Sequence, residues 1–125
     1  MSDPVADAAG FVPLMAEEEL AVGQIRAFAV KGWPVILARS AAGLRAMLNR
    51  CSHAATALEG GRVRRDFIIC PLHGAQFDLS TGACLSPTPY PKIRTFPLNV
   101  QDGMIAVQVP EEQPTVEELP VPTIG

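Results

Sequence analysis

The sequence CSH at residues 51–53 and the sequence CPLH at residues 70–73 contain both histidines of this 125-residue chain and two of its three cysteines. The pattern is C-x-H, sixteen further residues, and then C-x-x-H. Thiolate sulfur and imidazole nitrogen are side-chain ligands of transition metals, so the pattern predicts one site for either a small iron–sulfur cluster or a single zinc ion. Because no third histidine remains, a histidine general base, a catalytic triad and a second histidine-bound metal are excluded.

The composition is that of an ordinary globular domain, with 48% hydrophobic and 18% charged residues. Three cysteines, an odd number of which two belong to the metal pattern, are unlike a secreted disulfide framework and favour a reducing compartment. The N-terminus has no pattern of a signal peptide, and no apolar run approaches the roughly 18 residues of a membrane span. We therefore expect a soluble cytoplasmic protein, with neither a membrane nor a nucleic acid as its partner.

The charges divide the chain into a body and two acidic ends. Residues 1–10 and 110–125 carry six acidic and no basic residues, so residues 11–109 have a net charge of about +3 although the whole chain has −3. The segment 110–125 also contains four prolines, which exclude a continuous helix or a central strand. We predict a flexible segment at 1–10, one domain at 11–109, and an acidic proline-rich tail at 110–125 that either lies on the body or extends into solvent.

The body has the pattern of an all-β domain. Glycines separate short segments rich in strand-forming residues, at 24–30, 33–38 and 44–50. Further strands are expected at 62–69, which leads into Cys70, and on either side of the turn Asp102-Gly103, at 96–100 and 104–109. Gly60-Gly61 and Thr81-Gly82 are expected to form turns, and the one candidate helix, at 16–20, is very short.

The flanking residues carry a family resemblance. NRCSHA at 49–54, CPLHGAQFDLSTG at 70–82 and the proline-rich stretch 86–91 resemble the Rieske iron–sulfur family, and the likeness covers 11–109. The resemblance implies an all-β, Rieske-like fold of antiparallel β-sheets, in which a small cluster-binding subdomain at about 50–88 is inserted in a β-sandwich base. It implies that the stretch 86–91 is a proline loop covering the cluster.

The same resemblance implies the ligand set. In this family two cysteines bind one iron of a [2Fe–2S] cluster and two histidines bind the other. Carried over to this chain, Cys51 and Cys70 would hold the inner iron, and His53 and His73 would hold the outer iron near the surface, with one cluster per chain. Two alternatives remain: a tetrahedral zinc site with the same four ligands, and a disulfide between Cys51 and Cys70 that leaves the histidines unexplained.

Four further residues lie near the motif: a cysteine with a structural interpretation and three arginines with two possible interpretations. Cys84 has no histidine nearby and is expected to be a packed thiol. Arg62, Arg64 and Arg65 either form part of a docking face or lie on a solvated strand face, and the second interpretation is favoured.

Other positions predict the electronic properties of the cluster. Rieske proteins of cytochrome bc-type complexes have an additional disulfide, whose positions correspond here to Thr56 and Leu72. They also have a serine and a tyrosine that donate hydroxyl hydrogen bonds to cluster sulfur, where this chain has Ala75 and Phe77. Hydroxyl donors stabilise the more negative reduced cluster, so we predict a potential near the low end of the range of roughly −150 to +300 mV.

The resemblance is greatest to the stand-alone Rieske-type ferredoxins. These pass single electrons from a flavin-containing NAD(P)H reductase to a terminal oxygenase, often one acting on aromatic compounds. The chain lacks the histidines and the second domain of an oxygenase, so it is expected to be an electron-transfer component and no enzyme itself. The alternatives are a small Rieske-like subunit of a nitrite-reductase-like enzyme and a structural zinc module.

Overall fold

The computed structural model describes residues 10–51, 56–71, 74–85 and 91–114. Nine strands in these ranges form three antiparallel sheets of three strands each, and the only helical element described is the 3₁₀ turn η1 (Glu17–Glu19). In these ranges no helix is long and apolar enough to cross a membrane. The predicted all-β fold of antiparallel sheets is confirmed.

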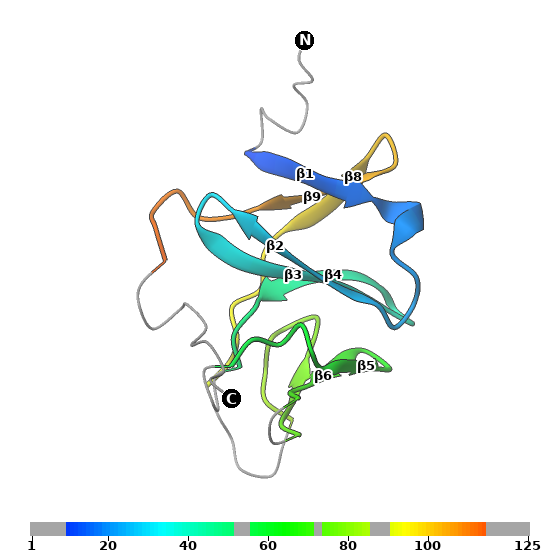
Figure 1. Ribbon diagram of the computed structural model, residues 1–125, viewed down its shortest axis with the longest axis vertical. Coiled ribbons are helices and arrows are strands. Elements are labelled where there is room, and N and C mark those ends of the chain that lie inside the picture. Colours follow the sequence, from blue (N-terminus) through cyan, green and yellow to red (C-terminus); the bar gives the residue numbers. More distant parts are fainter. Residues whose placement is uncertain (1–9, 52–55, 72–73, 86–90, 115–125) are drawn as a thin grey trace.

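The sheets follow one another down the molecule (Figure 1). The first contains, in spatial order, β1 (Phe11–Ala16), β9 (Met104–Gln108) and β8 (Leu98–Gln101). The second contains β2 (Ile25–Val30), β3 (Trp33–Ser40) and β4 (Gly43–Leu48). The third, called here the cluster sheet, contains β5 (Arg62–Arg64), β6 (Phe67–Ile69) and β7 (Gln76–Asp78). The first two sheets form the base, and the cluster sheet lies at the other end.

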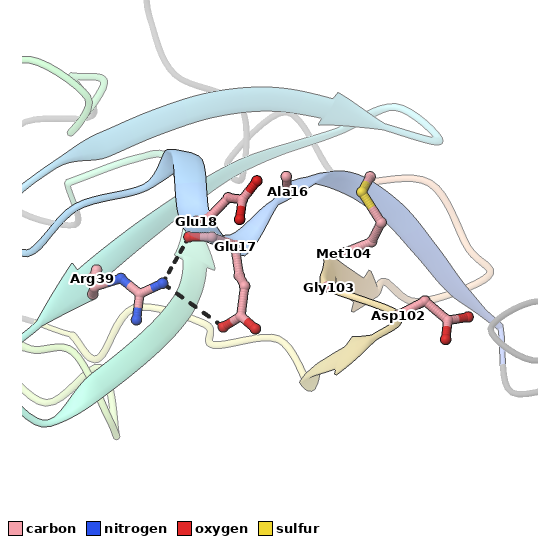
Figure 2. A pocket seen from close by; sticks show the side chains of 7 residues that line it. All are labelled: Ala16, Glu17, Glu18, Arg39, Asp102, Gly103 and Met104. Atoms are coloured by element: carbon pink, nitrogen blue, oxygen red, sulfur yellow. Dashed lines mark hydrogen bonds and ion pairs between the residues drawn. The ribbon is translucent and has the colours of Figure 1, made fainter.

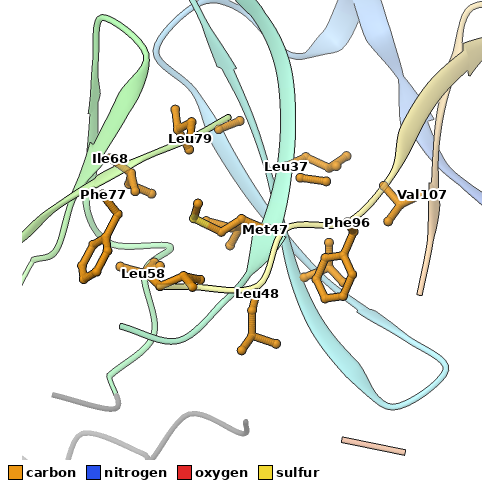
Figure 3. Packing of buried hydrophobic residues seen from close by; sticks show 14 of the residues in the cluster. Leu37, Met47, Leu48, Leu58, Ile68, Phe77, Leu79, Phe96 and Val107 are labelled. Carbon is orange, nitrogen blue, oxygen red and sulfur yellow. The ribbon is translucent and has the colours of Figure 1, made fainter. Parts of the chain in front are cut away.

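One continuous hydrophobic core joins the three sheets (Figure 3). β3 is the central strand of its sheet and is buried on both faces, which explains its nearly unbroken apolar sequence. Met47 of β4, Val107 of the first sheet and Ile68 of the cluster sheet are all fully buried and belong to this one core. Trp33 packs edge-on against Phe96, with ring centroids 5.9 Å apart.

Two local predictions were wrong. β1 was not expected, because its sequence FVPLMA has no polar alternation, yet it pairs with β9 along its whole length with a bulge between Pro13 and Met15. The segment 62–69 was expected to be one strand but is the hairpin β5–β6, since Arg65 has a left-handed φ of 54°. A non-glycine residue in that region costs of order 1 kcal/mol, and no glycine or asparagine signalled the turn.

The other elements agree with the sequence. The strands expected at 24–30, 33–38, 44–50, 96–100 and 104–109 are present with shifted ends. The Asp102-Gly103 turn joins β8 and β9, with both residues at positive φ as a type I′ hairpin requires. The candidate helix at 16–20 is reduced to η1.

The start of the predicted tail lies on the body. The indole Nε1–H of Trp33 donates to the Glu112 carbonyl at 3.0 Å, and Gln113 Nε2 donates to the Lys31 carbonyl at 3.4 Å. The segment 110–114 is therefore held against the β2–β3 turn. Residues 115–125, the proline loop positions 86–90, and positions 1–9 of the predicted flexible segment lie outside the described residues, so the predicted domain boundaries stay predictions.

Candidate metal centre

Two loops, one after β4 and one after β6, begin with the cysteines of the motif. Cys51 and Cys70 are 0% and 1% exposed, and neither is part of a disulfide, which removes the disulfide alternative. The backbone N–H of Cys51 donates to the Thr56 carbonyl at 2.7 Å, and that of Cys70 donates to the Ala75 carbonyl at 2.8 Å. Each bond spans five residues, so the same backbone bond closes both loops and places each cysteine at the same point of its loop.

The second loop needs the glycine that follows its histidine. The Gly74 N–H donates back to the Cys70 carbonyl at 3.1 Å, and Gly74 has a left-handed φ of 75°. This five-residue turn resembles a helix end, where glycine adopts that conformation without steric cost. Pro71 and Gly74 are exposed although Cys70 is buried, so the loop passes from the core to the surface within one turn.

The two loops pack closely against each other. Arg62, at the end of the first loop, is the register partner of Ile69, the residue before Cys70. A Cβ atom on Gly61 would lie 2.2 Å from the Ile69 carbonyl oxygen, so only glycine fits there. The neighbouring Gly60 faces the ring of Pro71 at ordinary van der Waals distance. The expected Gly60-Gly61 turn therefore brings the first loop into backbone contact with the strand that leads to the second.

Asn49 holds the first loop from inside, a role that the sequence did not predict. Its side chain is buried, and its Oδ1 accepts from the N–H groups of Leu58 at 2.6 Å and Glu59 at 3.1 Å. Its Nδ2 donates to Glu59 Oε1 at 3.0 Å. The side chain thereby ties the residue that precedes the loop to the residues that end it.

A second polar network ties the cluster sheet to the base. Asp66, in the β5–β6 turn, accepts from Arg45 Nη2 at 2.8 Å and Nε at 3.1 Å, and from Ser40 Oγ at 2.7 Å. The hydrogen bond from Arg45 is the main cause of a lowered Asp66 pKa, with a smaller contribution from Ser40. The bidentate geometry and partial burial make this pair stronger than an ordinary surface ion pair. It also explains how the turn tolerates Arg65 at positive φ.

The positions that predicted a low potential lie directly beside the second loop. Ala75 is 5% exposed, and Phe77 is fully buried on β7, where it pairs with Ile68 and forms a bridge with Cys84. Neither Ala75 nor Phe77 can supply a hydroxyl hydrogen bond. Cys84 packs against the hydrophobic core, as expected of a packed thiol.

The described part of the chain supplies half of the predicted ligand set. His53 and His73, and also Leu72, lie outside the described residues, so the assignment of the histidines stays a prediction. In the ranges that the structure describes, no three His, Cys, Asp or Glu side chains come together to hold a metal. The two buried thiols, unbridged and held by equivalent backbone bonds, fit the inner iron of a two-iron cluster, which takes two cysteines.

A pocket in the base has a structural origin (Figure 2). It is lined by Ala16, Glu17, Glu18, Arg39, Asp102, Gly103 and Met104. Arg39 donates to the carbonyls of Glu17 and Leu20, and the Glu17 N–H donates to the Gly103 carbonyl. Arg39 thus fastens η1 between the two base sheets, and the pocket lies away from the cysteine loops.

Comparison with known proteins identifies the family. The family model of the Rieske [2Fe-2S] domain matches residues 10–97. This range contains both cysteine loops and seven of the nine strands, and it ends just before β8 and β9. The chain belongs to the Rieske [2Fe-2S] domain family, as its sequence predicted.

Several relatives within this family are named as components of dioxygenases. The ferredoxin subunit of 3-phenylpropionate/cinnamic acid dioxygenase from Escherichia coli is 37% identical over 70 residues, which are 55% of this chain and 66%, just under two thirds, of the relative. The ferredoxin of carbazole 1,9a-dioxygenase from Nocardioides aromaticivorans superposes with a TM-score of 0.73 at 31% identity, over 78% of this chain and 96% of that one. A chain in the complex of reduced oxygenase and oxidised ferredoxin in carbazole 1,9a-dioxygenase also has a TM-score of 0.73, at 26% identity, over 79% of this chain and 93% of that one.

Proposed function

We propose that this chain is a Rieske-type ferredoxin, a one-electron carrier and no enzyme itself. The observation that carries the proposal is the pair of buried thiols, Cys51 and Cys70, held at equivalent positions of two adjacent loops. The names of the relatives, which are ferredoxin components of dioxygenases, support the same role.

The proposed ligand set is Cys51, Cys70, His53 and His73, with one [2Fe–2S] cluster per chain. Such a cluster would supply a one-electron couple. The chain's own part is to hold the two cysteines rigidly and dry. Their loops are closed by backbone bonds, so the positions of the sulfur atoms do not depend on the partner.

The proposed partners are a flavin-containing NAD(P)H ferredoxin reductase as electron donor and a terminal Rieske oxygenase as electron acceptor. We propose that the oxygenase acts on aromatic compounds, since the relatives are named as components of 3-phenylpropionate/cinnamic acid dioxygenase and carbazole 1,9a-dioxygenase. We place the protein in the cytoplasm, where its cysteines would stay reduced, and expect it to bind neither membrane nor nucleic acid. One carrier that serves two partners in turn needs weak, transient docking.

Iron and sulfide content, together with electron paramagnetic resonance after dithionite reduction, test the ligand assignment. Cys51→Ser and Cys70→Ser should abolish the rhombic signal of the cluster, and so should His53→Ala and His73→Ala. Cys84→Ser is the matched control and should keep it. A colourless wild-type protein with one zinc per chain would overturn the proposal in favour of a structural zinc module.

Reconstituted turnover tests the carrier role. The purified protein should support NAD(P)H-dependent product formation by a terminal oxygenase in the presence of a flavin reductase. The oxygenase and the reductase together should form no product when this protein is left out. Stable co-purification with a nitrite-reductase-like enzyme, and no turnover with any oxygenase, would instead favour the subunit alternative.

A further inference from the structure

The cluster sheet has one face in the core and one face in solvent. The inner face is formed by Val63, Ile68 and Phe77, which are register partners across β5, β6 and β7, and the last two are fully buried. Neighbouring residues along a strand point to opposite sides, and register partners point to the same side. The residues on either side of these three therefore form the outer face.

The outer face combines arginine with apolar side chains. Its two cross-strand rows are Arg62–Ile69–Gln76 and Arg64–Phe67–Asp78. Arg62 and Arg64 are exposed on β5, whereas Phe67 and Ile69 are half-buried on the middle strand. The exposed Arg65 continues the basic edge into the turn. We call the set Arg62, Arg64, Arg65, Phe67 and Ile69 the arginine face.

No described carboxylate forms an ion pair with the arginines of this face. Among the described residues, the ion pairs are Arg39–Glu17 and Arg45–Asp66, and the arginine face takes part in neither. Asp66 is next to Arg65 in sequence but accepts its hydrogen bonds from Arg45 and Ser40. Asp78 accepts from the N–H and Oγ of Ser80 at the end of β7.

The described part of the chain is polarised in the same sense. Residues 50–94 contain six basic and three acidic residues, a net +3, whereas the remainder of the chain contains four basic and ten acidic residues, a net −6. These sum to the net charge of −3 of the chain. Four of those ten acidic residues lie outside the described residues, so the described remainder, residues 10–49 and 95–114, has four basic and six acidic residues, a net −2. The end with the cysteine loops is therefore positive and the rest of the described chain is weakly negative, so an approaching acidic surface is steered toward the cluster end.

The arginine face also adjoins the metal centre. Its row Arg62–Ile69 ends at the residue before Cys70, and the Gly61 backbone touches the Ile69 carbonyl. A protein covering this row would also cover the rim of the second cysteine loop.

We propose that the arginine face docks on an acidic surface surrounding the redox centre of an electron-transfer partner protein. The inference rests on the proposed function and adds the chemistry of the contact. Phe67 and Ile69 supply a small apolar centre, and the three arginines supply a basic rim that sets the orientation and the association rate. The small extent of this face suits the transient docking of a carrier.

The test uses the full-length, cluster-loaded, oxidised protein and the double variant Arg62→Glu with Arg64→Glu. Association with the purified flavin reductase and with the purified terminal oxygenase is measured separately by surface plasmon resonance, at about 50 mM and about 500 mM salt. Because binding is measured on the oxidised protein, a change in reduction potential does not enter the result. Arg26→Glu, at an exposed position of β2 in the base, changes the net charge by −2 where the double variant changes it by −4, and it is the control for a charge reversal away from the arginine face.

We expect the double variant to associate with at least one of the two partners about tenfold more slowly at low salt, with the difference largely lost at high salt. Arg26→Glu should change the rate less than twofold. Equal rates for the wild type and the double variant with both partners, while oxygenase turnover persists, would overturn the docking face and leave the proposed function intact. Loss of turnover for the wild type itself would instead contradict the function. Low-salt self-association of the wild type that the double variant abolishes, measured by sedimentation, would show that the face binds a second copy, which also overturns the proposal.

Discussion

Replacement of Asn49 by alanine should destabilise the first cysteine loop by about 2–3 kcal/mol. Asn49 Oδ1 is the acceptor for two backbone N–H groups, those of Leu58 and Glu59. Leu58 is fully buried, so in the variant its N–H would have no hydrogen-bond acceptor from water or protein, which costs about 1–3 kcal/mol. Glu59 is exposed, so its N–H can form a hydrogen bond with water instead and adds little to the destabilisation. Lost packing of the buried amide makes up the remainder.

The assay has a global and a local component. Urea unfolding followed by circular dichroism gives the free energy of unfolding of the cluster-loaded protein. The rate at which a chelator bleaches the visible absorbance gives the opening of the loop. A local destabilisation of about 2 kcal/mol corresponds to roughly 30-fold faster bleaching, since about 1.4 kcal/mol is tenfold.

The matched control is Glu59→Gln. It keeps an acceptor for Asn49 Nδ2 and leaves both N–H bonds to Asn49 in place, so we expect a change within about 0.5 kcal/mol. If Asn49→Ala bleaches no faster than Glu59→Gln, the amide does not hold the loop and the reasoning fails.

Three further predictions concern the same end of the molecule. Ala75→Ser should raise the reduction potential by about 60 mV, measured by protein-film voltammetry, if the new hydroxyl stabilises the reduced state by about 1.4 kcal/mol; an unchanged potential would undercut the hydrogen-bond argument. Gly61→Ala should lower the free energy of unfolding by at least about 2 kcal/mol because its Cβ meets a carbonyl oxygen, whereas Gly60→Ala should cost less than about 1 kcal/mol; equal losses would contradict the close approach. The lowered pKa of Asp66 means that its ionised form stabilises the fold above the unfolded pKa of about 3.9, and that this contribution is lost as the pH falls through the lower folded value. In urea titrations, Asp66→Asn should therefore be less stable than the wild type at pH 6, and the difference should shrink toward pH 3; a difference that does not depend on pH would show that the charge is irrelevant.

The sequence predicted the base strands because their signals are local. The segment 33–38 is a dense run of strand formers, and Asp102-Gly103 is a pair that tolerates positive φ. β1 was not predicted because its strand character comes from pairing with β9, about ninety residues away in the chain. The β5–β6 turn was not predicted because arginine has no intrinsic preference for the left-handed backbone conformation that Arg65 adopts. Asp66, held by residues of β3 and β4, makes that conformation acceptable.

The site shows the same division. Ligand chemistry is a property of residue type and spacing, so Cys51 and Cys70 were predicted from the motif, and the structure buries both. Asn49 was not singled out, because the local capping pattern of an asparagine side chain reaches two to four residues, whereas this one bonds nine and ten residues ahead. Only the folded loop brings its partners within reach.

Asp66 connects the rigidity of the metal centre with the charge of the docking face. It lies between Arg65 and Phe67, where an unpaired carboxylate would cancel part of the basic surface. Its hydrogen bonds from Arg45 and Ser40 direct that negative charge toward the base and, by the same contacts, fasten the cluster sheet to it. One side chain thus fixes the sheet on which Cys70 is mounted and leaves the arginines of its outer face unneutralised. Asp66→Asn should therefore weaken the anchoring without removing the arginine face, whereas the Arg62 and Arg64 reversals should remove the face without loosening the anchor. Both variants are measured for stability in urea and for association rate at low salt. Asp66→Asn should lower the stability and keep the association rate, whereas the Arg62 and Arg64 reversals should lower the association rate and keep the stability. If each variant loses both, anchoring and docking are a single property of the sheet.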